Sequence, residues 1–561
     1  MDGRKFVNFK IIATSDVHGC FFPYDMIEQK EMLGSLARVS SFVKEQRQNP
    51  DQHVILLDAG DVLQGQPTTY YSNFVETDSS LLAADIMNTL HYDAVAMGNH
   101  DIETGHRVYD EWMKQLQCPV LAANLICRKT EKPYVAPYKI ITKEGVRIAV
   151  LGLLTTAIPY WLNEHLWEGL YFENMVEAAR KWIDILLQQE HVDLIVGLFH
   201  SGWSGGIQTP GFEENQTKRI AEEVPGFDLI IFGHDHILRQ EEVVCCTASG
   251  KTVLCMNPSS QALNISSIDV HLEFNKDQHV ISRQVVGEQV DISNYLIDLD
   301  FMQQFHTSFE TIRNFVSQPI GVLDHSIFTR DCYFGNAPFI DYIHDIQLQL
   351  TGADISFAAP LTYDTSLKAG ELHVYDLFRL YQYENWVNVL LLTGKEIKNF
   401  LELSYDRWIQ TMHSSSDEIM RIETYSYHGK LYYFFKNIAF NFDTAAGIDY
   451  EVDVTRPMGN RVRIIRMSNG NAFHLHQVYR VVMHSYRAHG GGELLTKGAG
   501  ISFSELPARI IYQSPHTQRY YLQKALMKAK HITISAHSNW KFVPDEWVKP
   551  ALKKAYFKLF H

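Results

Sequence analysis

The chain has 561 residues, which is too long for one ordinary domain, because domains usually hold roughly 100–200 residues. Hydrophobic residues make up 46% of it and charged residues 20%, as in a globular protein, and it lacks the run of about 20 apolar residues that a membrane-spanning helix needs. The net charge of −15 argues against a surface that coats nucleic acid, and an anionic substrate would require a local source of positive charge.

The cysteines and the N-terminus say little about the compartment. Seven cysteines form neither a CxxC motif nor a zinc-finger spacing, so buried or free thiols are expected. A disulfide from Cys245 or Cys246 to Cys255 stays open for an oxidising compartment. The first residues, MDGRKFVNFK, enter a strand-like run at once and do not resemble a signal peptide, which indicates either a cytoplasmic protein or a processed form.

Five apolar runs in the first half of the chain each end in polar side chains. Each run holds about five or six apolar residues, the pattern of a strand buried on both faces. Segments with helical periodicity lie between them, at Leu36–Gln48, Ser80–Leu90 and Glu177–Glu190. Strands that alternate with helices predict an α/β domain. The polar residues that follow the five runs are, in chain order, Asp16 and His18; Asp58, Asp61 and Gln64; Asn99 and His100; His200; and His234 and His236.

These polar groups should meet, because ligands of such sheets bind beyond the carboxyl ends of the strands. Any one of the motifs alone could be an ordinary strand end with a surface histidine, but five in one chain predict a shared site. Imidazole, carboxylate and amide ligands without thiolate suit manganese, zinc, iron, cobalt or magnesium. Seven ligands are too many for one catalytic ion with an open position and fit two ions that share a carboxylate. The candidate ligands are Asp16, His18, Asp61, Asn99, His200, His234 and His236.

The second half of the chain has a different pattern. Residues Val290–Gln318 have apolar residues near three-and-four spacing, which predicts a long helical connector. Residues Phe334–Pro360 predict a helix with an apolar face, a glycine stop and a strand. The aromatic and lysine-rich stretch Ser538–Phe560 fits a terminal helix that packs on the body, an oligomer contact or a membrane-surface element.

The order of the motifs D-x-H, G-D-x-x-x-G, G-N-H-[DE], H and G-H-x-H resembles that of the calcineurin-like metallophosphoesterase superfamily. More narrowly, the chain is similar to the nucleotidases that add a C-terminal nucleotide-binding domain. Signatures of that domain are similar to two segments of this chain, ELHVYDLFRLYQYEN and YRVVMHSYRAHGGGELL. The resemblance implies a four-layer α/β/β/α metallophosphoesterase domain at 1–289, the helical connector at 290–318, an α/β substrate-binding domain at 319–515 and an extension at 516–561.

The resemblance also implies roles for the residues of the metal site. One ion would be held by Asp16, His18, Asp61 and His236, and the other by Asp61, Asn99, His200 and His234. His100 would face the scissile phosphate, oriented by an acid three residues later. Relatives often carry Asp or Asn at that place and this chain has Glu103, so either Glu103 or Asp101 could pair with His100. For Asp101 we favour a role in capping the loop.

In this family two aromatic rings clamp the nucleobase, and by position these would be Tyr383 and Tyr486. Stacking on an aromatic ring contributes about 1–3 kcal/mol per base and accepts every base. Asn385 would bind the base edge, and the glycines Gly490 and Gly491 would let the backbone approach the nucleoside. A nucleotide is therefore the expected partner, and a nucleic-acid polymer is not.

One segment bears on the position of the phosphate. The 5′-nucleotidase branch usually has a glycine-rich segment ending in arginine where this chain reads SFAAPLTYDT. The Ala-Ala-Pro form is similar to the 2′,3′-cyclic-nucleotide 2′-phosphodiesterase/3′-nucleotidase branch, as are QGQP and FNFDTAAGIDYEVDV. A 5′-nucleotidase or UDP-sugar hydrolase is the alternative, and a non-catalytic nucleotide-binding protein a remote one. The resemblance implies a periplasmic or secreted protein, and a cytoplasmic location stays open.

Overall fold

The structure is a computed structural model that describes residues 5–209, 212–245, 250–277, 279–381, 384–427 and 430–561. The chain forms two compact units. Unit 1 comprises Met1–Pro159 and Asn163–Phe315, and unit 2 comprises Tyr160–Leu162 and Val316–His561.

Two six-stranded sheets form the centre of unit 1, in the orders β19-β18-β1-β4-β5-β6 and β16-β17-β15-β12-β10-β9. The strands that precede the polar motifs run parallel to their neighbours: β1 with β4 and β4 with β5 in the first sheet, and β12 with β15 in the second. The first sheet comprises β1 (Lys5–Thr14), β4 (His53–Asp58), β5 (Ala94–Ala96), β6 (Val120–Leu121), β18 (Asn264–Phe274) and β19 (Val280–Asp291). The second comprises β9 (Tyr138–Lys143), β10 (Val146–Leu154), β12 (Leu194–His200), β15 (Leu229–Phe232), β16 (Arg239–Val244) and β17 (Thr252–Asn257).

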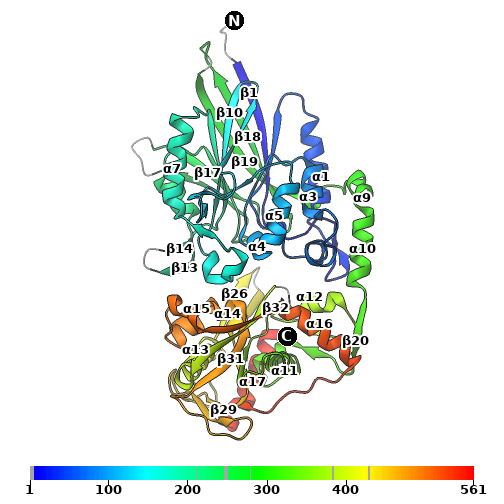
Figure 1. The fold of residues 1–561 in the computed structure, drawn as a ribbon, viewed down its shortest axis with the longest axis vertical. Helices are drawn as coiled ribbons and strands as arrows, with labels where there is room; N and C mark the ends of the chain where they lie inside the picture. Colours follow the sequence, from blue (N-terminus) through cyan, green and yellow to red (C-terminus); the bar gives the residue numbers. More distant parts are fainter. Residues whose placement is uncertain (1–4, 210–211, 246–249, 278, 382–383, 428–429) are drawn as a thin grey trace. The chain divides into compact units, whose positions relative to one another are not determined.

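Helices cover the outer faces of both sheets, which confirms the expected four-layer α/β/β/α domain. Side chains such as Ile11 and Leu57 of the first sheet pack against Val150 and Leu198 of the second. A second core lies under α7 (Met175–Gln188) and α8 (Thr217–Glu223). On the other side lie α1 (Leu36–Arg47), α3 (Leu82–Leu90) and α5 (His106–Gln115), as Figure 1 shows.

The expected helices of unit 1 form with small shifts at their ends. Ser35 caps α1 by accepting a hydrogen bond from the backbone N–H of Arg38, and Asn174 caps α7 in the same way. The stretch from Ser80 begins its helix two residues later, at Leu82, whose backbone N–H donates to Ser72 Oγ at 2.9 Å. These caps place the helices between the strands as the alternating pattern predicts.

The expected long helical connector at 290–318 is wrong in its first part. Val290 and Asp291 end strand β19, which pairs with β18 along its whole length. A short helix α9 (Leu299–Gln304) follows, and α10 (His306–Val316) begins after a break at Phe305. The carboxylate of Asp298 starts α9 by accepting hydrogen bonds from two backbone N–H groups, so the chain must turn there.

Unit 2 is built on a five-stranded mixed sheet in the order β28-β22-β31-β25-β32. Helix α11 (Pro338–Thr351) ends at Gly352, which adopts the left-handed conformation, and strand β22 follows, as the sequence predicts. Helix α13 (Gly394–Trp408) starts in a capping box of Thr393 and Glu396. The sheet strands are β22 (Ile355–Ala358), β25 (Trp386–Thr393), β28 (Thr444–Ala446), β31 (Val478–His484) and β32 (Ile510–Thr517).

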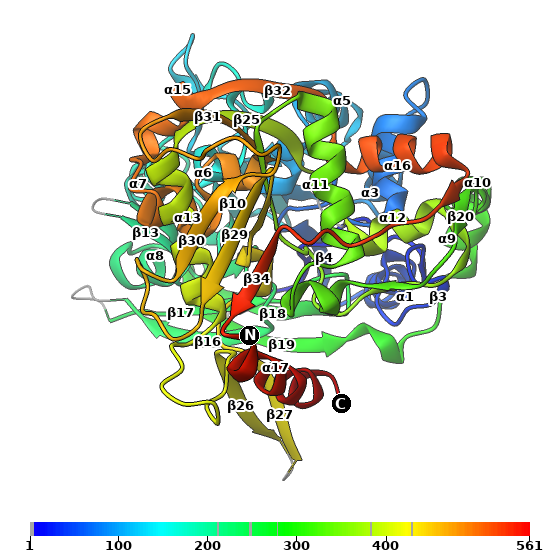
Figure 2. The ribbon, with the colours of Figure 1, turned by 90° about the horizontal axis from the view of Figure 1, so that it is seen from below.

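The C-terminal extension is part of the core of unit 2. Strand β34 (Trp540–Val543) pairs in parallel with β29 (Ile448–Asp453), and Trp540 and Phe542 are buried. Helix α17 (Asp545–Phe560) lies beside the hairpin of β26 (Ile422–Tyr427) and β27 (Lys430–Phe435), as Figure 2 shows. Of the three interpretations of this stretch, packing on the body describes the position of α17.

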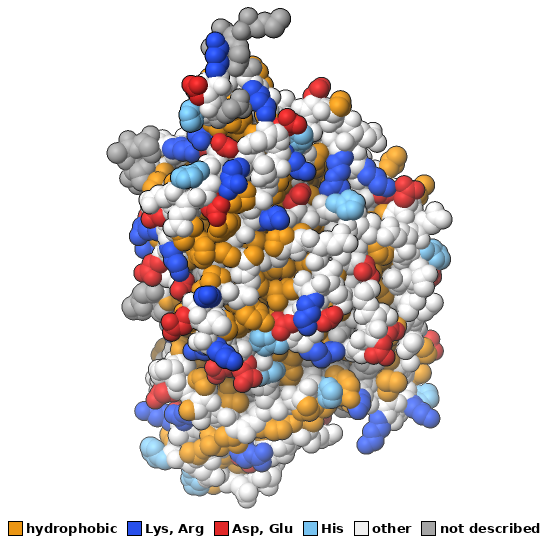
Figure 3. Space-filling view, turned by 45° about the horizontal axis from the view of Figure 1, so that its top comes forward, with side chains coloured by type: hydrophobic (Ala, Val, Ile, Leu, Met, Phe, Trp, Pro, Cys, Tyr) orange, Lys and Arg blue, Asp and Glu red, His pale blue; other side chains and the backbone are white. Residues whose placement is uncertain are grey.

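Three general expectations can be compared with the structure. Cys245 and Cys255 carry free thiols, and Cys246 lies outside the described residues. Within the described part of the chain, no helix combines the length and the apolar character that crossing a bilayer requires. Acidic and basic side chains are interspersed on the face drawn in Figure 3.

Candidate active site

The candidate metal ligands of unit 1 lie at the carboxyl ends of their strands: His200 ends β12, Asn99 begins a short helix after β5, and the other five lie in the loops that follow their strands. Five of the seven have backbone φ angles in the left-handed region, which non-glycine residues adopt rarely. This conformation turns the chain back on itself, so that the side chains of one loop face those of the next. The five φ angles are 49° for Asp16, 49° for His18, 62° for Asp61, 80° for His234 and 57° for His236.

A first cluster brings Asp16, His18 and His236 together, with their ligand atoms within 4.8 Å of one another. His236 Nε2 lies 3.2 Å from Asp16 Oδ1 and 3.1 Å from His18 Nε2. Nδ1 of His18 donates to the carbonyl oxygen of Gln64 at 2.8 Å, so its Nε2 keeps a lone pair. Burial raises the pKa of Asp16, but the neighbouring imidazoles of His236 and His200 lower it to about 2.

A second cluster comprises Asp61, His200 and His234, whose ligand atoms also lie within 4.8 Å of one another. Nδ1 of His200 donates to the carbonyl oxygen of Ala59 at 2.8 Å. Its Nε2 lies 3.0 Å from Asp61 Oδ2 and 3.0 Å from Asn99 Oδ1. Asp61 also interacts electrostatically with His18 of the first cluster, so it lies between the two groups.

The donor chemistry of these clusters fits divalent cations. If His200 is neutral and donates through Nδ1, its Nε2 carries a lone pair. That lone pair then faces the lone pairs of Asp61 Oδ2 and Asn99 Oδ1. Such a buried set repels itself unless a positive charge lies among the atoms. Burial lowers the pKa of His200, but the charges of Asp61 and Asp16 raise it to about 10. The site therefore favours a positive charge at this point, which a proton or a metal ion can supply.

His100 lies beside both clusters without belonging to either. It is in the short helix α4 (Asn99–Glu103), and its backbone N–H donates to Asp61 Oδ1 at 2.8 Å. Its ring stands edge-on to that of His18, with 5.4 Å between the centroids. Nδ1 of His100 is 2.5 Å from Glu103 Oε2. Burial lowers the pKa of His100, but Asp61 and Glu103 raise it to about 9.

Asp101 has a different place from Glu103. Its carboxylate is fully buried and accepts hydrogen bonds from the backbone N–H groups of Gly98, Asp61, Val62 and Leu63. It therefore ties the Asp61 loop to the start of α4. The acid that pairs with His100 in this structure is Glu103.

Gly98 allows the Asp61 loop to approach α4. A Cβ atom at Gly98 would lie 2.1 Å from Asp61 Oδ1 and 2.3 Å from the Asp61 backbone nitrogen. Gly98 has φ −102°, which any residue can adopt, so the reason for glycine is the space and not the backbone conformation.

The candidate nucleoside residues of unit 2 lie where β25 begins and β31 ends. Asn385 Oδ1 accepts a hydrogen bond from Ser485 Oγ at 3.4 Å, next to Tyr486. A Cβ at Gly491 would lie 2.6 Å from the ring of Tyr486, and one at Gly490 would lie 2.5 Å from Phe503. These two glycines thus pack against side chains of unit 2 itself. Tyr383 lies outside the described residues.

Some residues of the site were not singled out from the sequence. The carbonyl oxygens of Gln64 and Ala59 orient His18 and His200, and backbone oxygens leave no sequence signal. Glu214 contacts His234 Nε2 at 3.0 Å. Its only signal is an acidic pair, Glu213 and Glu214, between two histidine motifs.

Buried carboxylates and imidazoles gather at the strand ends of a two-layered β core between helices, and this donor set suits divalent metal ions. The chain combines two known domains: residues 9–238 are a calcineurin-like phosphoesterase domain, and residues 319–497 are a 5′-nucleotidase C-terminal domain. The resemblance seen in the motifs is thereby confirmed, and so is the two-domain α/β architecture.

Relatives and solved structures agree with this assignment. The chain is 27% identical over 96% of its length to the trifunctional nucleotide phosphoesterase protein YfkN of Bacillus subtilis, and it spans 39% of that protein. It is 24% identical over 96% of its length to the 2′,3′-cyclic-nucleotide 2′-phosphodiesterase/3′-nucleotidase of Haemophilus influenzae and spans 88% of it. A structure from Staphylococcus aureus assigned as a 5′-nucleotidase shares the fold, with a TM-score of 0.76 and 22% identity over 95% of this chain and 99% of that one.

Proposed function

We propose that the chain is a two-metal phosphoesterase that hydrolyses 2′,3′-cyclic nucleotides and 3′-nucleotides and releases nucleoside and phosphate. The observation that carries the hydrolytic part is that Asp61 Oδ2 and Asn99 Oδ1 each lie 3.0 Å from His200 Nε2, beside the His100–Glu103 pair. The relatives of similar length named for the cyclic-nucleotide activity, and the SFAAP segment, support the choice of substrate.

In this proposal Asp16, His18, Asp61 and His236 hold one divalent ion, and Asp61, Asn99, His200 and His234 hold the other. Bound divalent ions would polarise the phosphate and lower the pKa of water, and they would supply the positive charge that a protein of net charge −15 lacks at its surface. Manganese, zinc, iron, cobalt and magnesium all suit this donor set.

His100 is the group of the chain that acts on the phosphate. Glu103 accepts the Nδ1–H of His100, which holds the ring in place and favours a positive charge on it. A charged His100 can stabilise the negative oxygens of the phosphate and give its Nε2 proton to the departing ribose oxygen. Asp101 keeps the two loops at the right spacing.

In unit 2, Tyr486 and Tyr383 would stack on the nucleobase and Asn385 would bind its edge. Opening of the cyclic ester by water breaks the bond from phosphorus to the 2′ oxygen and leaves a 3′-phosphate. A second water then releases that phosphate and yields the nucleoside. Both steps need a single phosphate at the metals, which fits a chain that has no arginine in the segment after β22.

The proposal is tested by incubating the purified chain with manganese, zinc, cobalt or magnesium and a panel of substrates: 2′,3′-cyclic, 3′- and 5′-nucleotides and UDP-glucose. We expect the cyclic nucleotide to give the 3′-nucleotide and then the nucleoside. Preference for 5′-nucleotides or UDP-glucose would favour the alternative assignment as a 5′-nucleotidase or UDP-sugar hydrolase. Nucleotide binding without hydrolysis of any substrate would favour the remaining alternative, a non-catalytic nucleotide-binding protein.

A further inference from the structure

A small β-hairpin lies between His200 and His234 in the sequence. Its strands are β13 (Gly205–Thr209) and β14 (Phe212–Asn215), and it connects the loop after His200 to helix α8. The ring of His200 stands edge-on to the ring of His234, with 5.2 Å between their centroids. The hairpin therefore starts and ends beside the second cluster.

Glu214 is the residue of this hairpin that reaches the cluster. Its Oε1 lies 3.0 Å from His234 Nε2, and its Oε2 accepts a hydrogen bond from the backbone N–H of Ile207 at 2.7 Å. The Glu214 side chain is only 13% exposed. Gly206 has φ +76°, and a Cβ there would lie 2.4 Å from Glu214 Oε2, so the hairpin leaves room for this carboxylate.

The backbone around Glu214 is fastened to the loops that follow β10 and β12. The carbonyl oxygen of Glu214 accepts hydrogen bonds from Thr155 Oγ1 at 2.9 Å and from Ser201 Oγ at 3.4 Å. The side chain of Asn215 accepts one from the backbone N–H of Gly202 at 2.8 Å. These bonds fix the backbone of Glu214, and the bond from Ile207 fixes its carboxylate, which distinguishes it from a mobile surface acid.

We propose that Glu214 is a positioning residue for His234. A carboxylate accepts, so the hydrogen bond requires the proton of His234 to be on Nε2, and this leaves the lone pair of Nδ1 for a metal ion. A carboxylate that orients a ligating histidine in this way typically contributes a factor of 10–100 in metal affinity or activity. The inference rests on the proposed two-metal function, because His234 has this role only if the second cluster binds an ion.

The test is a titration of the metal-free full chain with Mn²⁺, in which free Mn²⁺ is followed by electron paramagnetic resonance. Three variants are compared with the wild type: Glu214→Met, Glu214→Gln and Glu213→Ala. Methionine keeps the length of the side chain and removes both acceptors, whereas glutamine keeps one acceptor oxygen. Glu213 lies on the same strand, and its carboxylate is 3.4 Å from Gln208 Nε2, so it is the matched control.

We expect Glu214→Met to weaken the second Mn²⁺ by about 10–100-fold, Glu214→Gln to restore most of that affinity, and Glu213→Ala to match the wild type. The loss of turnover in Glu214→Met should be reversed by excess Mn²⁺. Equal Mn²⁺ affinity in Glu214→Met and wild type, or equal weakness in the Met and Gln variants, would overturn the positioning role while the two-metal function stands. A wild type that binds no Mn²⁺ and hydrolyses no substrate with any of the metals tested would instead refute the proposed function. If Glu214→Met does not fold, the comparison of Glu214→Gln with Glu214→Ala decides in the same way.

Discussion

His344 should make the stability of unit 2 depend on pH. It lies in α11, is completely buried and sits between two hydroxyl groups. Its Nδ1 is 2.8 Å from Ser356 Oγ, and its Nε2 is 3.0 Å from Thr444 Oγ1. Because Ser356 gives its own proton to Gln347 Oε1, it accepts from His344 Nδ1–H, and the network suits a neutral imidazole.

The magnitude follows from the pKa of this group. Burial, with a smaller contribution from the nearby His537, lowers the pKa of His344 from 6.5 to about 3. The folded state therefore resists protonation that the unfolded state accepts, so the stability is complete above pH 6.5 and is lost as the pH falls towards 3. At pH 5 the loss is about 2 kcal/mol, since each pH unit below the unfolded pKa contributes about 1.36 kcal/mol.

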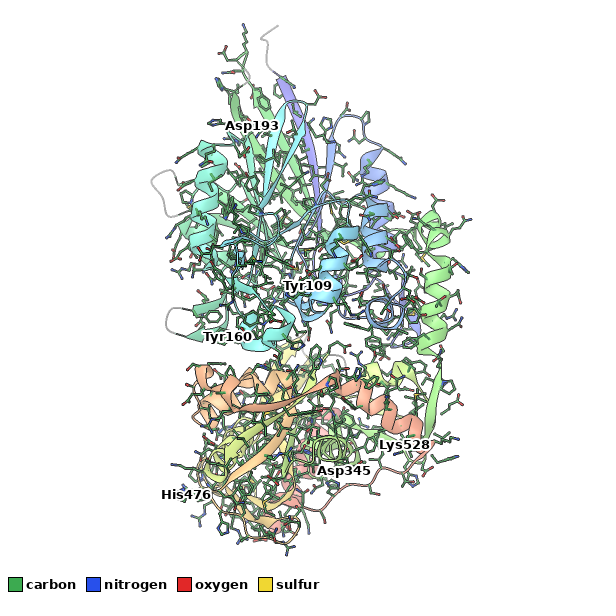
Figure 4. All side chains as sticks on the ribbon, in the orientation of Figure 1. Tyr109, Tyr160, Asp193, Asp345, His476 and Lys528 are labelled. Carbon is green, nitrogen blue, oxygen red and sulfur yellow. The ribbon has the colours of Figure 1, made fainter. Side chains whose placement is uncertain are left out.

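The assay is unfolding of the full chain in urea at pH 7 and pH 5, read in unit 2 by pulsed hydrogen exchange of peptides from α11. We expect His344→Gln to be less stable than the wild type at pH 7 but to lose about 2 kcal/mol less between the two pH values. His476, exposed in the loop before β31 and labelled in Figure 4, gives the control variant His476→Gln, which should keep the wild-type dependence. An unchanged pH dependence in His344→Gln would refute the reasoning.

Two further predictions concern unit 1. His100→Asn should lower turnover by about 10²–10⁴-fold, the usual share of a proton-transferring group, while bound metal measured by mass spectrometry stays at the wild-type level. Wild-type turnover in that variant would exclude His100 from the reaction. Gly98→Ala should abolish metal binding, because its Cβ would lie 2.1 Å from Asp61 Oδ1, and a variant that still binds two ions per chain would contradict this.

The sequence predicts the elements of this protein where burial is complete. Strands such as β12, buried along its whole length, appear as continuous apolar runs, and their ends place the candidate ligands. Strand β19 cannot be predicted in this way, because it is mostly exposed and mixes charged with apolar residues. Its pairing with β18 depends on the fold, so a connector starting at Val290 was the reasonable but wrong interpretation.

The same distinction holds for the site. His18 and His200 follow strands and could be predicted, but the carbonyl groups that set their tautomers come from other loops and carry no side-chain signal. The family resemblance narrows the partner of His100 to Asp101 or Glu103, and only the conformation of α4 decides between them. Glu214 acquires its contact with His234 when a hairpin folds back.

Five candidate ligands have a left-handed backbone, which limits the substitutions that evolution can accept at them: Asp16, His18, Asp61, His234 and His236. Each such residue destabilises the fold by about 1–3 kcal/mol, a large share of the roughly 5–15 kcal/mol that holds a domain together. Glycine would relieve that penalty at every one of these positions and would remove a candidate metal ligand each time. Substitutions that make the fold more stable thus fall at the same positions as substitutions that would remove the proposed metal centre.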